Sequence, residues 1–152
     1  PGFIEGGDVL VTDTHLYIGL SARTNINGAI QLGQYAKEFG GLETVILEIP
    51  QNWLHLKGGV SYHYRIFLQQ RLIVVNELVA KYFKNSGCQL LVTPRDERFG
   101  ANCVSSGHTI YIHDQCPVTK SVLKEYGYCV KEINLSEFKK IDGAMTCLSK
   151  LF

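Results

Sequence analysis

The pattern of apolar and polar positions divides the first fifty residues into two strands, a helix and a third strand. Residues 8–12 and 15–19 alternate apolar with polar positions around a short turn, which is typical of a β-hairpin. Apolar residues then recur at helical spacing over 26–39, after Asn25 as an N-cap and before a glycine pair that can end the helix. The β-branched run 43–49 predicts the third strand. The order is therefore β-β-α-β.

The same order of elements returns twice further along the chain. The elements predicted for the second unit are strands 59–64 and 71–75, a helix from Asn76 to about Lys84, and strand 89–93. Those predicted for the third unit are strands 101–104 and 109–113, a helix over 118–126, and strand 128–133. A structural period of this size indicates a repeat architecture even without residue identity.

A closing segment follows the third unit. It is expected to hold a short helix that ends at Lys140 and a strand over residues 145–151. The sequence contains neither a glycine–serine linker nor a charge run, so we expect one α/β domain. The domain is expected to span residues 1–152, with repeats at about 8–50, 59–94 and 101–133 and the closing helix and strand within 135–152.

Composition and charge exclude several classes of protein. Hydrophobic residues make up 45% of the chain and charged residues 19%, as in a globular domain. Fifteen basic and fourteen acidic side chains give a net charge of +1, which predicts no nucleic-acid partner and no anionic membrane surface. The longest uncharged stretches are interrupted by polar residues or glycine, so no segment is expected to span a bilayer.

The cysteine content favours free thiols. The chain has an odd number of cysteines and no CxxC pair, so neither a structural zinc site nor a full set of disulfides is expected. Because no signal peptide opens the sequence, we expect a reducing compartment, the cytoplasm. The cysteines are Cys88, Cys103, Cys116, Cys129 and Cys147.

The first residue is Pro1, which leads into the first strand within a few residues. Three such units would leave sheet edges open, whereas a closed array leaves none. The predicted last strand also lacks a hairpin partner. We therefore expect that further chain precedes Pro1. If no such chain covers the open sheet edges, we expect these edges to favour homo-oligomers.

Two charged positions lie where the chain enters an element. Glu5-Gly6-Gly7-Asp8 places two carboxylates beside two glycines before the first strand, where they could reach a cationic ligand, although a plain tight turn explains the same residues. Arg23 precedes the N-terminus of the first helix, where it could hold an anion or simply be solvated.

A histidine and a cysteine could carry chemistry. His55 lies in an apolar stretch beside glycines and the only tryptophan, where it is either a general base or a core residue. Cys147 follows a glycine turn near the end of the sequence and is either a nucleophile or a buried thiol. We expect the other histidines on strand surfaces or in the core: His15, His63, His108 and His113.

Five segments taken in order are more specific than any one of them. They are IEGGDVLV (4–11), YIGLSARTNINGA (17–29), LHLKGGVSY (54–62), GANC (100–103) and KIDGAMTCLS (140–149). Together they resemble the catalytic, C-terminal part of the dimethylarginine dimethylaminohydrolases, relatives of the arginine deiminases and amidinotransferases. The resemblance covers essentially the whole chain. The SxRTN, LHLK and DGxxTCLS patterns point most narrowly to the dimethylarginine group.

The resemblance implies a pentein fold, an α/β propeller of five β-β-α-β units, of which about three are present here. It implies hydrolysis of dimethylarginine to citrulline and dimethylamine through a covalent thiouronium, without metal or cofactor. The implied roles are Cys147 as nucleophile, His55 as acid and base, Glu5 to orient the histidine, Arg23 for the substrate carboxylate and the Ile141 carbonyl near the guanidino group. The family also uses acidic residues and a second arginine from an N-terminal half, so activity is expected to need that half.

Two other readings stay open. One is an arginine deiminase-like or amidinotransferase-like enzyme that acts on another guanidine. The other is a non-catalytic pentein module that associates with a second chain through open sheet edges. In the enzyme readings, the partner is a small guanidino substrate.

Overall fold

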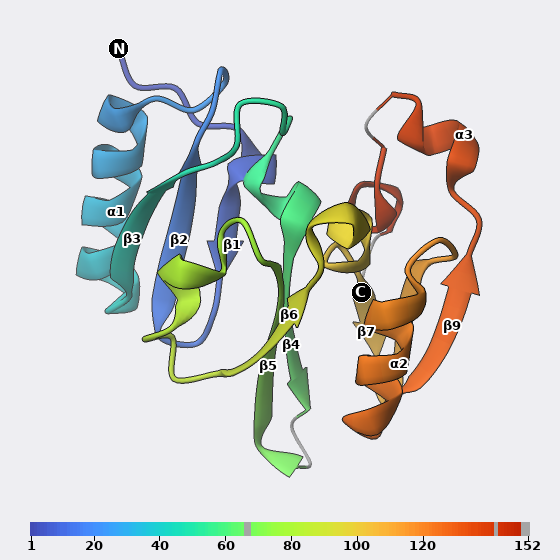
Figure 1. Cartoon of the computed structure of the whole chain (residues 1–152). Coiled ribbons are helices and arrows are strands. Elements are labelled where there is room, and N and C mark those ends of the chain that lie inside the picture. Colours follow the sequence, from blue (N-terminus) through green and yellow to red (C-terminus); the bar gives the residue numbers. More distant parts are fainter. Residues whose placement is uncertain (66–67, 142, 150–152) are drawn as a thin grey trace. The chain divides into compact units, whose positions relative to one another are not determined.

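The structure is a computed structural model that describes residues 1–65, 68–141 and 143–149 (Figure 1). The chain forms two compact units, Pro1–Lys57 and Gly58–Phe152. One three-stranded sheet is described in the first unit and two in the second. In each of these sheets the first strand is antiparallel to the second, and the second is parallel to the third. The predicted α/β class and the repeated strand order are confirmed, and the single domain expected from the sequence stays a prediction.

The first unit contains strands β1 (Val9–Val11), β2 (His15–Leu20) and β3 (Glu43–Glu48) and helix α1 (Ile26–Gly40). The side chain of Asn25 caps α1 by accepting a hydrogen bond from the backbone N–H of Gly28 at 2.8 Å. Gly41 ends the helix in the left-handed conformation, with φ of 63°. Helix α1 lies along β2 and β3 (Figure 1) and buries Ile18 and Ala29 between helix and sheet. The predicted hairpin, helix and third strand are all present.

The second unit opens with strands β4 (Val60–Arg65), β5 (Gln70–Asn76) and β6 (Gln89–Thr93). Residues 77–84, which lie in the predicted helix, contain the 3₁₀ turn Ala80–Phe83 and further turns. The amide of Asn76 donates to the carbonyl of Pro94 at 2.7 Å and accepts from the N–H of Leu78 at 3.3 Å. The chain after Asn76 forms turns and a short 3₁₀ turn instead of an α-helix, so the predicted helix is wrong.

The third repeat contains strands β7 (Val104–Ser106), β8 (Thr109–His113) and β9 (Cys129–Ile133) and helix α2 (Pro117–Glu125). The segment Arg95–Gly100 forms 3₁₀ turns, and the strand predicted over 101–104 begins only at Val104. The carbonyl of Ala101 accepts a hydrogen bond from the hydroxyl of Ser61 at 2.7 Å. Backbone groups ahead of Val104 are thus used outside the strand ladder, so the prediction is wrong for its first three residues.

A buried carboxylate caps helix α2. Glu97 accepts hydrogen bonds from the N–H groups of Val118 and Thr119 at 2.9 and 2.7 Å, and from the Thr119 hydroxyl at 2.7 Å. Negative charge at this end of a helix is favourable, because the free N–H groups and the helix dipole both point at it. Pro117 at the start of the helix loses no hydrogen bond there.

The chain ends differently from the prediction. Helix α3 (Ser136–Lys139) is present, but Met145–Leu148 form a 3₁₀ turn where a strand over 145–151 is predicted. The carbonyl of Ala144 accepts the N–H groups of Cys147 and Leu148, at 3.0 and 3.3 Å. Because these donors are used within the turn, the strand prediction is wrong for residues 145–148, and residues 150–152 lie outside the described part of the chain.

The apolar core of the second unit comes from both of its repeats. Strands β5, β6 and β8 and helix α2 all contribute to it. Its buried residues are Leu72, Val74, Leu91, Ala101, Cys103, Ile110, Ile112, Cys116, Leu123 and Tyr128. Among the described residues, the helices are too short or too polar to cross a membrane.

Candidate active site

The Glu5–Asp8 motif leads into β1 through the 3₁₀ turn Gly6–Asp8. The carboxylate of Asp8 is 0% exposed, and one of its oxygens accepts hydrogen bonds from the hydroxyls of Ser21 at 2.6 Å and Thr24 at 2.7 Å. The other oxygen accepts the backbone N–H of Leu56 at 3.0 Å. One buried carboxylate therefore joins the start of β1, the loop after β2 and the segment that carries His55.

His55 lies beside this carboxylate. Its Nδ1 is 3.9 Å from an oxygen of Asp8, and its side chain is 17% exposed. Nδ1 is buried without a hydrogen-bond partner among the described residues. A Cβ atom added at Gly7 would lie 2.5 Å from Cγ of His55, so the imidazole packs against the backbone of that glycine. The structure thus brings together His55 and the second half of the motif.

Glu5 is half-buried and is held through its backbone. Its N–H donates to the hydroxyl of Thr24 at 2.9 Å, and its carbonyl accepts the N–H of Asp8 at 2.9 Å. Within the described part of the chain, the carboxylate recorded next to His55 is that of Asp8. The orienting role of Glu5 stays a prediction, and Asp8 is a neighbour that the motif alone did not single out.

Arg23 lies in the exposed loop between β2 and α1. Its backbone N–H donates to the hydroxyl of Ser21 at 3.0 Å, and that hydroxyl donates in turn to Asp8. The backbone that carries the guanidinium is therefore tied to the carboxylate beside His55. A guanidinium fork at such an exposed position can bind a carboxylate in two-point fashion.

Cys147 lies in the second unit, with an exposed side chain on the turn Met145–Leu148. Two and three residues before it, Met145 and Ala144 are buried. The thiol is thus exposed to solvent on a turn whose first residue is buried in the core. Ile141 is 78% exposed, and its N–H donates to the carbonyl of Phe138 at 3.1 Å.

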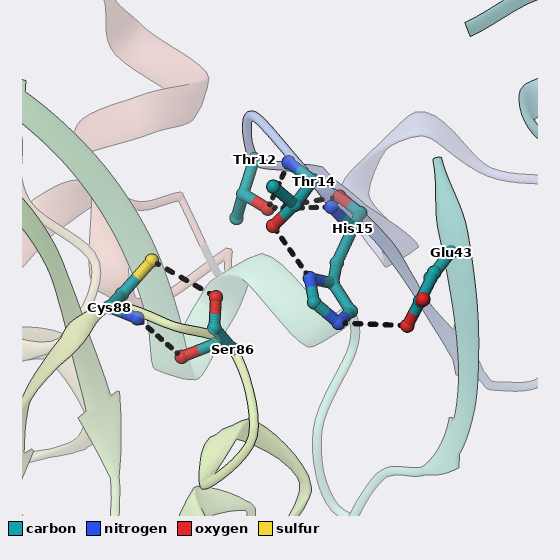
Figure 2. Close-up of polar contacts among 6 residues, drawn as sticks. All are labelled: Thr12, Thr14, His15, Glu43, Ser86 and Cys88. Carbon is teal, nitrogen blue, oxygen red and sulfur yellow. Dashed lines mark hydrogen bonds and ion pairs between the residues drawn. The ribbon is translucent and has the colours of Figure 1, made fainter. Parts of the chain in front are cut away.

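The other cysteines divide by burial. Burial raises the pKa of the Cys103 thiol to about 12 and that of Cys116 to about 11. The thiolate is the nucleophilic form, so these two thiols are unsuited to attack a substrate. Cys129 is exposed on β9, and Cys88 is half-buried and bonded to Ser86 through both N–H and sulfur (Figure 2).

Sequence reasoning missed a buried polar network in the second unit. Nε2 of His63 lies 2.9 Å from the hydroxyl of Ser61 and 3.2 Å from the sulfur of Cys103, and its Nδ1 lies 2.9 Å from the hydroxyl of Ser105. Burial lowers the pKa of His63 to about 4, so the imidazole is neutral. A buried neutral histidine beside a protonated thiol is a structural pair. The alternation of Ser61 and His63 on one face of β4 was the available signal.

His15 has a structural role as well, as expected for a strand histidine. Figure 2 shows its ring between Thr14, whose hydroxyl is 2.8 Å from Nδ1, and Glu43, whose carboxylate is 3.5 Å from Nε2. The hydroxyl of Thr12 accepts the N–H of His15 at 3.0 Å. His15 and Glu43 are register partners of β2 and β3, so these contacts fasten the start of that strand pair. Over the residues that the structure describes, His, Cys, Asp and Glu side chains form no group that could hold a metal ion.

Comparison with known proteins supports the resemblance stated from the sequence motifs and the fold. No family model matches the chain. The dimethylarginine dimethylaminohydrolase of Pseudomonas aeruginosa is 32% identical over 152 residues, which cover 100% of this chain and 57% of that enzyme. The chain thus spans little more than half the length of this relative.

Solved structures of similar fold include a dimethylarginine dimethylaminohydrolase and an amidinotransferase. A cysteine-to-serine mutant of the Pseudomonas aeruginosa enzyme, complexed with citrulline, superposes with a TM-score of 0.80 and 28% identity over 97% of this chain and 55% of that one. An amidinotransferase from Microseira wollei reaches a TM-score of 0.75 at 15% identity, over 93% of this chain and 45% of that one, which shows the fold alone. The similarity over the whole of this chain and the repeat topology together show that it resembles the dimethylarginine dimethylaminohydrolases and shares their pentein-type fold.

Proposed function

We propose that the protein containing this chain hydrolyses dimethylarginine to citrulline and dimethylamine. The similarity of all 152 residues to the Pseudomonas aeruginosa enzyme carries this proposal. The solved structure of that enzyme as a cysteine-to-serine mutant with citrulline supports a cysteine as the residue that reacts. In this chain that residue is Cys147, whose thiol is exposed.

The reaction proceeds in two halves. The thiolate of Cys147 attacks the central guanidinium carbon, and His55 gives a proton to the departing dimethylamine as the carbon–nitrogen bond breaks. A covalent thiouronium is left on the sulfur. His55 then takes a proton from water, which attacks the same carbon, and the carbon–sulfur bond breaks to release citrulline and the thiol.

The remaining roles follow the charges of the substrate. Glu5 orients His55, as the third member of a catalytic triad does. Arg23 binds the α-carboxylate of the substrate, and its exposed position suits a soluble ligand. The backbone carbonyl of Ile141 lies near the guanidino group. Acidic side chains from the part of the protein that matches the rest of the relative complete the site, so we propose that the 152-residue chain needs that part for turnover.

The decisive experiment measures citrulline release from dimethylarginine by the whole protein that contains this chain. We expect Cys147→Ser to abolish release and Cys129→Ser, at the other exposed cysteine, to retain it. Comparable turnover by the Cys147→Ser variant would overturn the assignment of the nucleophile.

A substrate panel separates the other readings. Arginine as the preferred substrate would indicate a deiminase-like enzyme, and transfer of the amidino group to an amine acceptor would indicate a transferase. A protein that turns over none of these guanidines, yet forms a tight dimer, would be a non-catalytic module. The low identity to the amidinotransferase gives no support for transfer chemistry beyond the fold.

A further inference from the structure

The GANC segment contains a buried amide that contacts the cysteine turn. Asn102 is 2% exposed, and its Nδ2 donates to the hydroxyl of Thr146 at 2.9 Å. The N–H of Thr146 donates back to Oδ1 of Asn102, also at 2.9 Å. Thr146 immediately precedes Cys147, although Asn102 is far away in the sequence. Both halves of one amide thus hold the residue next to the thiol.

The backbone around Asn102 is itself fixed. Ala101 is fully buried and Cys103 nearly so. The N–H of Ala101 donates to the carbonyl of Arg98 at 3.0 Å, and its carbonyl accepts the hydroxyl of Ser61 at 2.7 Å. Asn102 therefore projects from a rigid part of the third repeat.

The turn that carries Cys147 is short. The backbone N–H groups of Cys147 and Leu148 both donate hydrogen bonds to the carbonyl of Ala144. A single 3₁₀ turn has few internal hydrogen bonds and weak geometry, so its conformation depends on outside contacts. The two bonds to Asn102 are such contacts, and they act on the residue directly before the thiol.

We propose that Asn102 is a positioning residue that fixes the turn carrying Cys147. The proposal rests on the proposed function in one respect, namely that Cys147 is the nucleophile. Two-point bonding sets both position and orientation, which a nucleophile needs, because a displacement of about 1 Å can lower a rate by roughly 10²-fold. An aspartate would lack the N–H donor and a serine would be too short to make both bonds, so asparagine suits this position.

The first test is amide hydrogen exchange, measured by NMR on the 152-residue chain. We expect Asn102→Ala to speed exchange of the Thr146 and Cys147 N–H groups by about tenfold or more, since one loses its acceptor and the other its ordered turn. Thr146→Ser keeps both bonds and should behave as the parent chain. Unchanged exchange at Thr146 and Cys147 in Asn102→Ala would overturn the proposal.

Asn76→Ala is the matched control, because Asn76 is also a buried asparagine bonded to backbone on both sides of its amide. It should lower the stability of the second unit without changing exchange at Thr146 and Cys147. If Asn102→Ala does not fold, Thr146→Val removes the hydroxyl acceptor alone. It should then speed exchange of the Cys147 N–H, whereas no difference between Thr146→Val and Thr146→Ser would count against the proposal.

The second test measures citrulline release by the whole protein that contains this chain. Asn102→Ala should lower kcat by about 10²-fold and leave KM within about threefold, because the nucleophile is misplaced while substrate binding is intact. Thr146→Ser should retain the parent kcat, and a loss of kcat in Asn76→Ala equal to that in Asn102→Ala would show a merely structural role for Asn102. If the parent protein releases no citrulline, the proposed function fails, and hydrogen exchange still decides whether Asn102 positions the turn.

Discussion

Nδ1 of His55 lies 3.9 Å from the carboxylate of Asp8, and that same carboxylate accepts the N–H of Leu56, the next residue in the chain. Asp8 thus contacts both the imidazole and the backbone that carries it. Its hydrogen bonds to Ser21 and Thr24 leave it no freedom to turn away. The position of His55 therefore depends on Asp8, the buried last residue of the Glu5–Asp8 motif.

Asp8→Asn should lower both stability and activity. The asparagine has the same size, but its NH₂ group cannot accept the hydrogen bonds that Asp8 accepts, so we expect a loss of about 1–3 kcal/mol in the free energy of unfolding. Urea unfolding of the chain measures it. Glu97→Gln, at the buried carboxylate that caps α2, should lose a similar amount while citrulline kcat stays unchanged. An Asp8→Asn variant with the parent kcat and pH profile would remove Asp8 from the site.

Gly7→Ala should displace the histidine. The new Cβ would lie 2.5 Å from Cγ of His55, which no rotamer of alanine can relieve. We expect citrulline release to fall by about 10²-fold, as for other displacements of a reacting group. Gly6→Ala is the control, since nothing lies within 4 Å of its added Cβ. Equal effects of the two substitutions would contradict the packing of His55 on Gly7.

Acid should destabilise the second unit through His63. Burial lowers its pKa to about 4 in the folded chain, against 6.5 for an ordinary histidine. Between these values the unfolded chain binds a proton that the folded chain does not. The free energy of unfolding therefore falls as pH drops through this window, by up to about 1.4 kcal/mol per pH unit, while above it the contribution is constant.

Urea unfolding at several pH values tests this effect. The fall should be steeper in the parent chain than in His63→Gln, which lacks the titrating group. His108→Gln, at an exposed histidine, should keep the steep fall. Equal slopes in the parent and His63→Gln would show that other groups cause the acid sensitivity.

Four of the five thiols should divide into a fast-reacting and a slow-reacting pair. Under native conditions iodoacetamide should label Cys147 and Cys129, which are exposed, and spare Cys103 and Cys116, which are buried and have raised pKa values. Mass spectrometry of the labelled peptides measures this order. Urea should abolish it, and rapid native labelling of Cys103 would contradict its burial.

Local pattern predicted most of the sheet framework. Strands β6 and β8 have the bounds expected from alternation and β-branching, and the helices at α1 and α2 follow their caps and apolar spacing. The failures occur where a side chain bonds to distant backbone. Asn76 was expected to cap a helix, but its amide also bonds across to Pro94 and only a 3₁₀ turn follows. Asn102 was expected in a strand and instead holds Thr146. Such partners are set by the fold, and no window of neighbouring residues contains them.

The sequence predicted the candidate residues of the site, but not the contacts that these residues make. The motifs identify His55, Cys147 and the acidic turn as candidates. They do not show that Asp8 lies against His55, nor that His63 and Cys103 form a buried histidine–cysteine pair. Cys103 is buried beside His63, whereas the thiol of Cys147 is exposed, so burial separates the inert thiol from the candidate nucleophile.

The second repeat keeps the strand pairing of its neighbours although 3₁₀ turns replace the helix in its crossover. The part that all three repeats share is thus the antiparallel pair with a parallel third strand, whereas the crossover segment differs between repeats. A template for finding further copies in longer sequences should fix the strands and let the intervening segment vary. A template that required the helix would skip the middle copy and miscount the repeats.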